Sequence, residues 1–497
     1  MNERRTTADD REPTTDAEGK TGPTRAAVGT PPPGPRGLPV INSTLGFARD
    51  PLEFLSSIRE YGDVAHYEAF GREFVVVSDP GLVETVLVAR DDEFWRGEFE
   101  HEFSEVLDVE GLFFAEGERW RNQRLLLQNA FTPARIQSYA DDMVDETVRL
   151  VEDWSDGEVV DVREAMSTLT LRALTRSLFD LEYKEPRFSE PNRGSHPRSF
   201  GGDRADCVQR WVQAMGAYSD SEFFGIRAVL PTWLPSRAER EYRRATADVE
   251  ALVEEMVAER RRSDAAGGDL LSLLATGEYP NGSRPTAEEI TGQLQLFLLA
   301  GHETTATVLT YACWLLAAAD VEDVRSRLEQ EVTTVCGDRD PTFADLPDLA
   351  ITEAVGREAM RLYPPLPFLQ REPHEATTLA GYRIGPATTV QLNMYGIHRD
   401  ERWWSEPDAF RPDRWLSNDE DGRSVVADRD DRPEYAYFPF GGGSRHCIGM
   451  RFAMAELQLS LATMVRRVDL ERVTESIDPT PRVSLDPGPV EMRVRRR

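Results

Sequence analysis

Most of the hydrophobic pattern along this chain repeats at helical spacing. Apolar positions recur every three to four residues, with charged residues between them, over residues 134–180. The same pattern returns over residues 208–217 and 237–262. Strand-like alternation is limited to short segments, such as residues 74–77 and the region after Tyr363. The pattern therefore predicts a mainly α fold with small β-sheets.

A capping box marks the start of the longest predicted helix. Thr286 and Glu289 have the spacing at which each side chain bonds the backbone N–H of the other residue. The helix is expected to run about thirty residues, or roughly 45 Å at 1.5 Å per residue. Its apolar stretch, residues 294–319, is interrupted by His302 and Glu303, which favours a buried helix over a membrane span.

The N-terminal segment differs in composition from the rest of the chain. Residues 1–30 are nearly free of large apolar groups, so they are predicted to form a disordered tail. A Pro-rich run at 31–35 marks the entrance to the folded part, and residues 186–206 have the composition of a loop. The length of 497 residues alone suggests about three domains. Because no internal repeat or interior linker divides the chain, we predict one large domain over residues 31–497.

The charge is strongly acidic. The net charge is −30, with 88 acidic against 58 basic residues, and only Lys20 and Lys184 among the basic ones are lysines. A carboxylate-rich, Lys-poor surface is typical of a halophilic protein, in whose high-salt cytoplasm self-repulsion is screened. An ordinary acidic cytosolic protein is the alternative. In either case the charge argues against nucleic acids and anionic membranes as main partners.

Four cysteines stand at spacings that suit neither a zinc site nor a disulfide framework. They are Cys207, Cys313, Cys336 and Cys447, a set that fits a reducing cytosol. The start of the chain has no signal peptide and is too polar for a membrane anchor. We therefore expect a soluble, cytoplasmic protein.

The most informative segment is the Gly-rich stretch over residues 440–449, which leads into a helical pattern. Its cysteine, Cys447, is placed as a thiolate ligand would be. A helix N-terminus offers N–H donors and a positive dipole to a thiolate, and glycines allow a tight turn and close approach. A Gly-rich turn before a buried structural cysteine is the alternative.

This stretch resembles the haem-thiolate loop of the cytochrome P450 family, F-x-x-G-x-R-x-C-x-G. The fixed positions are matched by Phe440, Gly443, Arg445, Cys447 and Gly449. The resemblance implies that Cys447 is the protein ligand of the iron of haem b, and that Arg445 binds a haem propionate. It also implies haem contacts for Phe440, Gly441 and Gly449. A thiolate ligand pushes electron density onto the iron and favours O–O cleavage.

A second motif lies midway along the long predicted helix. Residues 300–305, Ala-Gly-His-Glu-Thr-Thr, resemble the oxygen-activation motif A-G-x-[DE]-T-[ST] of the same family. The resemblance implies that Ala300 lies against the haem, that Thr304 holds the activated oxygen and a water, and that Glu303 relays protons. A threonine pair bonded only to its own backbone is the alternative.

Two further motifs involve arginines. Glu358 and Arg361 resemble the E-x-x-R pair, which in the family locks with a downstream arginine, here Arg414, into a structural triad behind the cysteine loop. Trp120 and Arg124 match W-x-x-x-R and point the same way along a helix, so the resemblance implies that both reach one propionate.

Arg371 stands where relatives supply another propionate partner. A surface ion pair is the alternative for each of these arginines. Two histidines near these motifs, His398 and His446, are not expected to bind iron, because the family uses one protein ligand.

The resemblance covers residues 31–497 and implies the cytochrome P450 fold, a single large domain around a buried haem. The implied activity is monooxygenation of an apolar, lipid-like substrate such as a fatty acid or terpenoid. Electrons from NAD(P)H would arrive through a separate partner, a ferredoxin with its reductase, docking near Cys447 and Arg451 of a monomeric enzyme.

Two alternatives of other classes stay open. One is a peroxygenase or isomerase of the same fold, against which the Glu303-Thr304 pair argues. The other is a non-catalytic haem-binding sensor or carrier. The segments that form the pocket in relatives offer a set of large apolar residues here: Phe99, Phe103, Leu112, Phe113, Phe114, Phe223, Phe224, Leu296, Phe297, Leu366, Phe368 and Leu369. They suit an apolar substrate, or equally a plain core.

Overall fold

The computed structural model describes residues 29–37, 42–107, 109–181, 203–224, 236–262, 269–419, 423–427 and 431–497. The predicted tail, except its last two residues, and most of the predicted loop over 186–206 lie outside these ranges. At the end of the predicted tail, Gly29 N donates to Gly381 O (3.2 Å) and Thr30 O accepts from Arg383 N (3.0 Å). Backbone contacts with the rest of the fold are therefore already made before the Pro-rich run.

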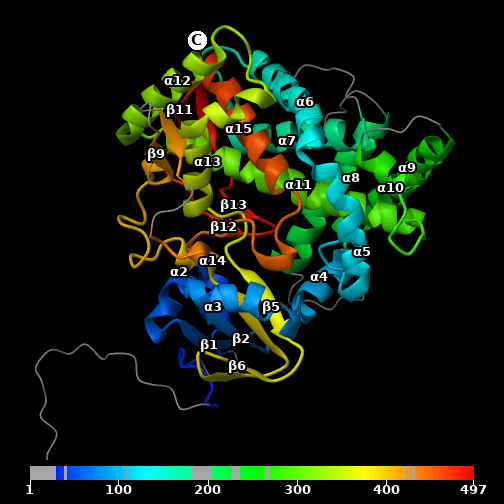
Figure 1. The fold of residues 1–497 in the computed structure, drawn as a ribbon, viewed down its shortest axis with the longest axis vertical. Helices are drawn as coiled ribbons and strands as arrows, with labels where there is room; N and C mark the ends of the chain where they lie inside the picture. Colours follow the sequence, from blue (N-terminus) through cyan, green and yellow to red (C-terminus); the bar gives the residue numbers. More distant parts are fainter. Residues whose placement is uncertain are drawn as a thin grey trace, which may run out of the picture.

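Helices form most of the molecule, as predicted (Figure 1). The α-helices are α1 Thr44–Arg49, α2 Pro51–Ser57, α3 Pro80–Glu84, α4 Glu98–Leu107, α5 Gly117–Leu127, α6 Pro133–Glu152, α7 Val162–Phe179, α8 Asp203–Ser219, α9 Arg237–Arg262, α10 Leu270–Thr276, α11 Ala287–Leu316, α12 Glu322–Cys336, α13 Ala350–Leu362, α14 Met394–Ile397 and α15 Met450–Arg467. Short 3-10 turns include η9 Pro412–Trp415 and η11 Gly443–Arg445.

The strands form small sheets, the largest of which lies at one end of the helical body (Figure 1). Five strands in the order β1-β2-β8-β5-β3 make this sheet: Val64–Ala69, Arg72–Val77, Thr388–Leu392, Leu369–Pro373 and Phe94–Trp95. All neighbours are antiparallel except β2 and β8, which pair in parallel with Glu73 opposite Thr388.

The other sheets have two or three strands. A three-stranded sheet has the order β11-β14-β4, made of Val468–Arg472, Glu491–Arg496 and Val159–Asp161. The two-stranded ones pair β6 Thr377–Leu379 with β7 Tyr382–Ile384, β9 Leu416–Asn418 with β10 Ser424–Val426, and β12 Thr480–Pro481 with β13 Leu485–Asp486.

The helical pattern over residues 134–180 corresponds to two helices, α6 and α7, with strand β4 between them. The chain turns after Trp154, where Gly157 has φ +79° and its N–H bonds Val494 O at 2.8 Å. A Ser-Asp-Gly sequence supplies this turn, because glycine adopts positive φ without strain. The predicted helical pattern is therefore confirmed, and the structure divides it into two helices.

Helix α11 is the central helix of the molecule and begins with the predicted capping box. Thr286 Oγ1 accepts from Glu289 N (3.1 Å), and Glu289 Oε2 accepts from Thr286 N (3.0 Å). The helix is 30 residues long and mostly buried, because it packs against α7, α9, α13 and α15. Side chains halfway along it are thereby held in the interior.

No single helix among the described residues is both long and apolar enough to cross a membrane. Helix α11 and residues 319–336 reach that length and composition only together, and they are bent by 85° relative to each other.

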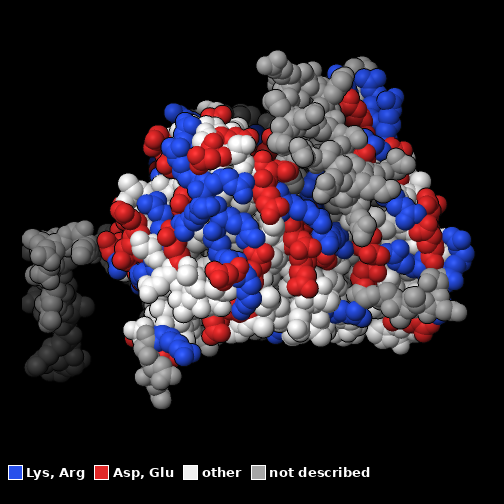
Figure 2. All heavy atoms as spheres, turned by 90° about the horizontal axis from the view of Figure 1, so that it is seen from above, with Lys and Arg blue, Asp and Glu red and all other residues white. Residues whose placement is uncertain are grey.

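Charges of both signs are interleaved over the face that Figure 2 shows. Ion pairs between such charges include Asp340 with Arg466 (3.1 Å) and Arg467 (2.5 Å), and Arg339 with Asp345 (2.6 Å). Basic and acidic side chains therefore lie side by side on this face.

Candidate functional site

A cavity lies between α11 and the loop that carries Cys447. Its volume is about 250 Å³, whereas a single water needs only roughly 10–15 Å³. Mainly apolar side chains line it: Phe113, Phe131, Leu174, Leu178, Phe297, Val308, Met360, Pro365, Leu366, Leu369, Phe452 and Leu457. The cavity can hold a large, mostly apolar molecule.

Cys447 opens into this cavity from a loop whose backbone is tightly wound. Cys447 N donates to Phe440 O at 2.9 Å, which closes the loop. Gly441 and Gly443 have φ of +71° and +64°, and a Cβ on Gly443 would lie 1.9 Å from Leu87 O. Other residues would be strained at these two positions, so the glycines let the loop press against its neighbour.

Some features around the Cys447 sulfur disfavour the thiolate, and others favour it. Burial raises the pKa of the Cys447 thiol, whereas N–H groups of Gly449 and Met450 and the charge of Arg124 lower it. Both N–H groups belong to the start of α15, which begins at Met450 with Gly449 as its N-cap. These donors suit a thiolate that is also bound to a metal ion, which removes the thiol proton outright.

Three arginines, Arg96, Arg371 and Arg445, line the same cavity. Burial and the nearby positive charges lower the pKa of Arg371 to about 9, although Glu100 and Glu116 oppose the effect. Arg445 Nη1 donates to Ala115 O at 2.7 Å, and its Nη2 pairs with Glu116.

This cluster is the observation that tests whether haem fits the site. Nε of Arg96 is buried and has no hydrogen-bond partner among the described residues. Burying cations is costly unless anions or acceptors satisfy them. Haem carries two carboxylates, so the arginine cluster on one side and the thiol with its N–H donors on the other are complementary to it.

Trp120 and Arg124 come from α5 but do not line the cavity. The Trp120 ring lies under the Arg445 guanidinium, with 4.7 Å from Cζ to the ring centroid. Arg124 donates to His446 O at 2.9 Å, and its Nη2 lies 3.2 Å from His446 Nε2. The two side chains thus hold Arg445 and the cysteine loop in place.

Thr304 faces the cavity from the middle of α11, next to Ala300, Gly301 and Thr305. Its Oγ1 donates to Ala300 O at 2.8 Å, and Thr305 Oγ1 donates to Gly301 O at 3.2 Å. Each threonine thus bonds the carbonyl one turn back, as both interpretations of the motif require. What separates the two interpretations is that Thr304 shares one cavity with Cys447.

Glu303 points elsewhere. It does not line the cavity, and its Oε1 pairs with Arg163 Nη2 at 2.6 Å. Ser484 Oγ donates to the same oxygen at 3.4 Å, and Arg163 Nε also pairs with Asp486 at 3.1 Å. The predicted proton relay therefore needs Glu303 to leave Arg163, or protons to pass along this network.

The structure brings Glu358, Arg361 and Arg414 together. Arg361 makes a two-pronged pair with Glu358 (2.8 and 2.9 Å), and both side chains have 0% exposure. Arg414 Nε donates to Glu358 Oε1 at 3.1 Å. Sequence reasoning missed Trp415, whose Nε1 donates to Glu358 Oε2 at 2.9 Å, although it directly follows Arg414.

His398 joins this triad to the cysteine loop. Its carbonyl accepts from Arg361 Nη1 at 2.8 Å, and its Nε2 accepts from Phe438 N at 3.1 Å. Phe438 O in turn accepts from Gly441 N at 2.9 Å. Burial and the charges of Arg361 and Arg399 hold the pKa of His398 well below its usual value, so the ring is neutral and can accept.

Of the residues expected around the pocket, Phe113, Phe297, Leu366 and Leu369 line the cavity. Several others do not: Leu112, Phe114 and Leu296 belong to the core, Phe103 and Phe368 pack against it, and Phe99 is 41% exposed. The side chains of Phe223 and Phe224 lie outside the described part. The sequence offered no signal for Arg96, Arg163 or the linking role of His398.

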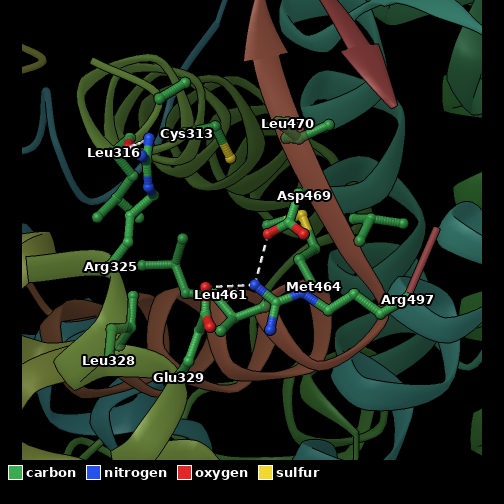
Figure 3. Close-up of a pocket in the computed structure, with 13 residues that line it drawn as sticks. Cys313, Leu316, Arg325, Leu328, Glu329, Leu461, Met464, Asp469, Leu470 and Arg497 are labelled. Carbon is green, nitrogen blue, oxygen red and sulfur yellow. Dashed lines mark hydrogen bonds and ion pairs between the residues drawn. The ribbon is translucent and has the colours of Figure 1, made fainter. Parts of the chain in front are cut away.

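A smaller cavity of about 60 Å³ lies at the far end of α11, near the C-terminus (Figure 3). Cys313 and Leu461 form part of its apolar wall, and Arg497 bridges Glu329 and Asp469 at its rim. Burial raises the pKa of the Cys313 thiol to about 12, so this thiol is not a reactive one.

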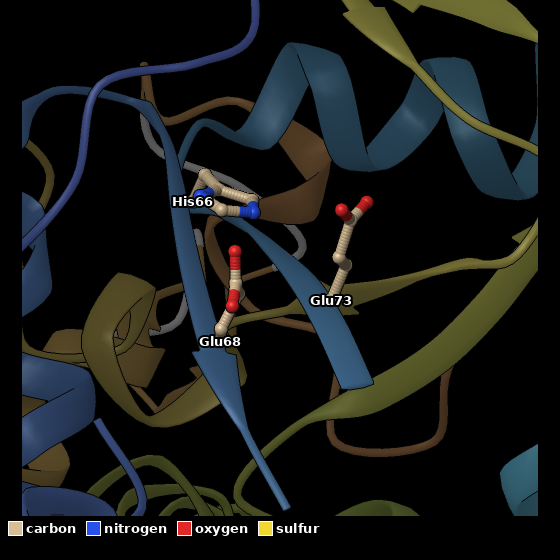
Figure 4. Close-up of side chains that lie close together, drawn as sticks. All are labelled: His66, Glu68 and Glu73. Atoms are coloured by element: carbon tan, nitrogen blue, oxygen red, sulfur yellow. The ribbon is translucent and has the colours of Figure 1, made fainter. Parts of the chain in front are cut away.

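Three potential metal ligands, His66, Glu68 and Glu73, lie together on the β1–β2 hairpin (Figure 4). Glu68 accepts from Asn42 Nδ2 at 2.5 Å and Glu73 from Thr388 Oγ1 at 3.4 Å. Both carboxylates are exposed, and groups of exposed acids are common without a bound ion.

Comparison with known proteins supplies the family. The family model for cytochrome P450 matches residues 32–494. Cyclooctatin synthase of Streptomyces melanosporofaciens is 34% identical over 92% of this chain and 94% of its own length. Cyclooctat-9-en-7-ol 5-monooxygenase of the same organism is 31% identical over 93% and 94%. Pentalenene oxygenase of Streptomyces avermitilis is 30% identical over 87% and 89%.

Among solved structures, the haem domain of cytochrome P450DA superposes with a TM-score of 0.79 at 25% identity. The match covers 95% of this chain and 99% of the other.

Proposed function

Since the chain belongs to the cytochrome P450 family and is a P450 monooxygenase, we propose what it oxidises and how it is reduced. The substrate is a terpenoid-like molecule, and the electrons come from a separate redox protein. The observation that carries the proposal is the single apolar cavity to which both Cys447 and Thr304 open. Three related enzymes are named for cyclooctatin, cyclooctat-9-en-7-ol and pentalenene. Bulky hydrocarbon skeletons of that kind match an apolar cavity.

Haem supplies the activation of dioxygen when it is bound, and the protein supplies its environment. Cys447 would be the iron ligand, with the N–H groups of Gly449 and Met450 holding its negative charge. Arg96, Arg371 and Arg445 would bind the two haem carboxylates. Thr304 would hold a water and direct its proton into the cavity, while the surrounding phenylalanine and leucine side chains exclude bulk solvent.

The electron donor would dock on the side of the molecule that carries the cysteine loop. Arg451 follows this loop in sequence, and Arg121 lies one turn before Arg124, which contacts the loop through His446 O. Both arginines are exposed and present positive charge in an otherwise acidic protein. A ferredoxin, which is acidic and small, has the complementary charge. A ferredoxin reductase would then draw electrons from NAD(P)H.

The test has two steps. The reduced, haem-loaded protein with carbon monoxide should show the far red-shifted Soret band of thiolate ligation. With a ferredoxin, its reductase and NADPH, it should then convert a terpenoid such as valencene to an oxygenated product. Conversion with hydrogen peroxide alone would favour the peroxygenase, and binding without conversion would favour the sensor or carrier; either result contradicts the proposal.

A further inference from the structure

A buried polar side chain lies on the cavity-facing stripe of α11. Gln293, Phe297, Ala300 and Thr304 are spaced by four, three and four residues, so they share one helix face. The last three line the cavity. Gln293 is 1% exposed and lies one turn beyond Phe297, roughly 10 Å along the axis from Ala300.

The opposite wall at this level is the loop before α5. Gln293 Oε1 accepts from Leu112 N at 3.0 Å, and the next residue, Phe113, lines the cavity. The loop lies close to the helix, because a Cβ on Gly292 would be 2.9 Å from Glu110 O. Gln293 therefore lies where the loop meets α11, between the lining residues Phe113 and Phe297 and outside the lining itself.

One half of the Gln293 amide is satisfied and the other is not. Since Leu112 N–H needs an acceptor, the amide orientation is determined and Nε2 is the free end. Nε2 is buried and finds no acceptor among the described residues. A buried donor without a partner is destabilising, and such groups are rare in native proteins unless a water or ligand satisfies them.

Resting on the proposed function, we propose that Gln293 anchors the substrate: Nε2 donates a hydrogen bond to an oxygen carried by an otherwise apolar molecule. The other polar side chains of α11 on this stripe are already bonded, as Thr304 Oγ1 is to Ala300 O. A pure hydrocarbon would leave Nε2 unsatisfied, whereas a ketone, alcohol or ether would satisfy it. Such a substrate must come from a reaction that has already placed oxygen on the hydrocarbon skeleton.

The experiment compares a ketone with its parent hydrocarbon, nootkatone with valencene, by the spin-state shift each causes in the haem-loaded enzyme. In Gln293→Met the Kd of nootkatone divided by the Kd of valencene should rise about tenfold, which corresponds to about 1.4 kcal/mol. The Kd of valencene should stay unchanged. Gln295→Met is the matched control, since Gln295 Nε2 is also buried and unpartnered but lies about 200° around the helix.

Equal weakening of both ligands in Gln293→Met would mean that Gln293 holds the loop rather than the substrate, and would overturn the proposal. An unchanged ratio would mean that Nε2 bonds only a water or another part of the chain, with the same consequence. If neither ligand shifts the spectrum of the wild-type enzyme, the proposed apolar substrate itself is wrong.

A measurement on the wild-type enzyme covers the case in which the variant does not fold. The C=O stretching band of bound nootkatone should move to lower frequency than in an alkane solvent if Nε2 donates to it. An unshifted band would overturn the proposal.

Discussion

At the scale of the residue, Cys447 owes its character to groups that the loop brings to the sulfur. Burial alone would keep it a thiol, and the N–H groups of Gly449 and Met450 with Arg124 act in the opposite direction. The other three cysteines are buried and lie on helices α8, α11 and α12, away from the cavity. Iron ligation should therefore depend on Cys447 alone.

Replacing Cys447 with alanine should abolish thiolate ligation, because the substituted residue has no donor atom for iron. The measurement is the carbon monoxide difference spectrum of the reduced protein, in which the far red-shifted Soret band should disappear. Cys336→Ala, at a buried cysteine that does not line the cavity, should keep the band. A Cys447→Ala spectrum like that of the wild type would contradict the ligand assignment.

Replacing Thr304 with alanine should leave haem and substrate binding intact but waste electrons as hydrogen peroxide. The hydroxyl that would position a water in the cavity is lost, so product per NADPH should fall by about tenfold, the effect of one lost hydrogen bond of about 1.4 kcal/mol. Thr310→Ala is the control, because Thr310 makes the same bond one turn back (2.8 Å) without lining the cavity. Unchanged coupling in Thr304→Ala would show that its hydroxyl serves only the helix.

At the scale of the element, a chain of contacts links helix α13 to the cysteine loop. It runs from Glu358 through Arg361 and the His398 carbonyl to the His398 ring and Phe438 N. Because each member is buried, the loop position depends on the whole chain rather than on one contact. Two substitutions test it.

Arg361→Lys should cost about 3–5 kcal/mol of unfolding free energy, the usual effect of breaking a buried pair. Lysine keeps the charge but cannot serve Glu358 and the carbonyls of His398, Pro407 and Ala409 together. Urea unfolding measures the loss. The control Arg327→Lys alters an exposed pair with Asp413 and should cost less than about 1 kcal/mol. Equal losses of unfolding free energy in the two variants would contradict a structural role for the chain of contacts between α13 and the cysteine loop.

The buried ring of His398 should make stability depend on pH. Its folded pKa is lowered, so only the unfolded chain takes up the proton as pH falls below about 6.5. Stability should therefore decrease below that pH, by at most about 1.4 kcal/mol per unit from this group. Buried His302, whose pKa is also lowered, adds to the decrease.

His398→Gln keeps an acceptor for Phe438 N but does not titrate, so its urea midpoint should fall less steeply between pH 6.5 and 5.5. The exposed His374→Gln should behave as the wild type does. Parallel curves for the wild type and His398→Gln would contradict the assigned role.

Sequence motifs predicted those parts of the site whose residues lie close together in the chain. The capping box at Thr286, the glycines around Cys447 and the spacing of Glu358 and Arg361 all depend on neighbours within one or two turns. Arg163 and Arg96 gave no signal, because their partners are brought to them by packing across the chain. The sequence offered no signal for Gln293 either, because its role depends on Leu112, which lies 181 positions away in the chain.

At the scale of the whole molecule, many acidic side chains form ion pairs with arginines. The chain still carries a net charge of −30. Exposed pairs contribute little each, whereas the excess of carboxylates repels throughout the surface. Salt weakens both effects, and with thirty unbalanced negative charges the relief of repulsion should dominate.

The melting temperature should therefore rise between 0.1 and 1 M KCl, over which the screening length falls from about 10 to 3 Å. Scanning calorimetry in KCl and in NaCl measures it, and the two salts should agree if screening is the cause. A falling melting temperature would show that the ion pairs outweigh the repulsion. A response to only one cation would indicate specific binding instead.

Strand β14 has a further consequence for how this protein is made. Residues 491–496 lie between β11 and β4, so the middle strand of this sheet is synthesised long after its neighbour β4. At roughly 5–20 residues per second, β4 must wait tens of seconds for its partner during translation. Nascent chains would carry an unpaired edge for that time, and an affinity tag fused after Arg497 would stand directly beside this middle strand.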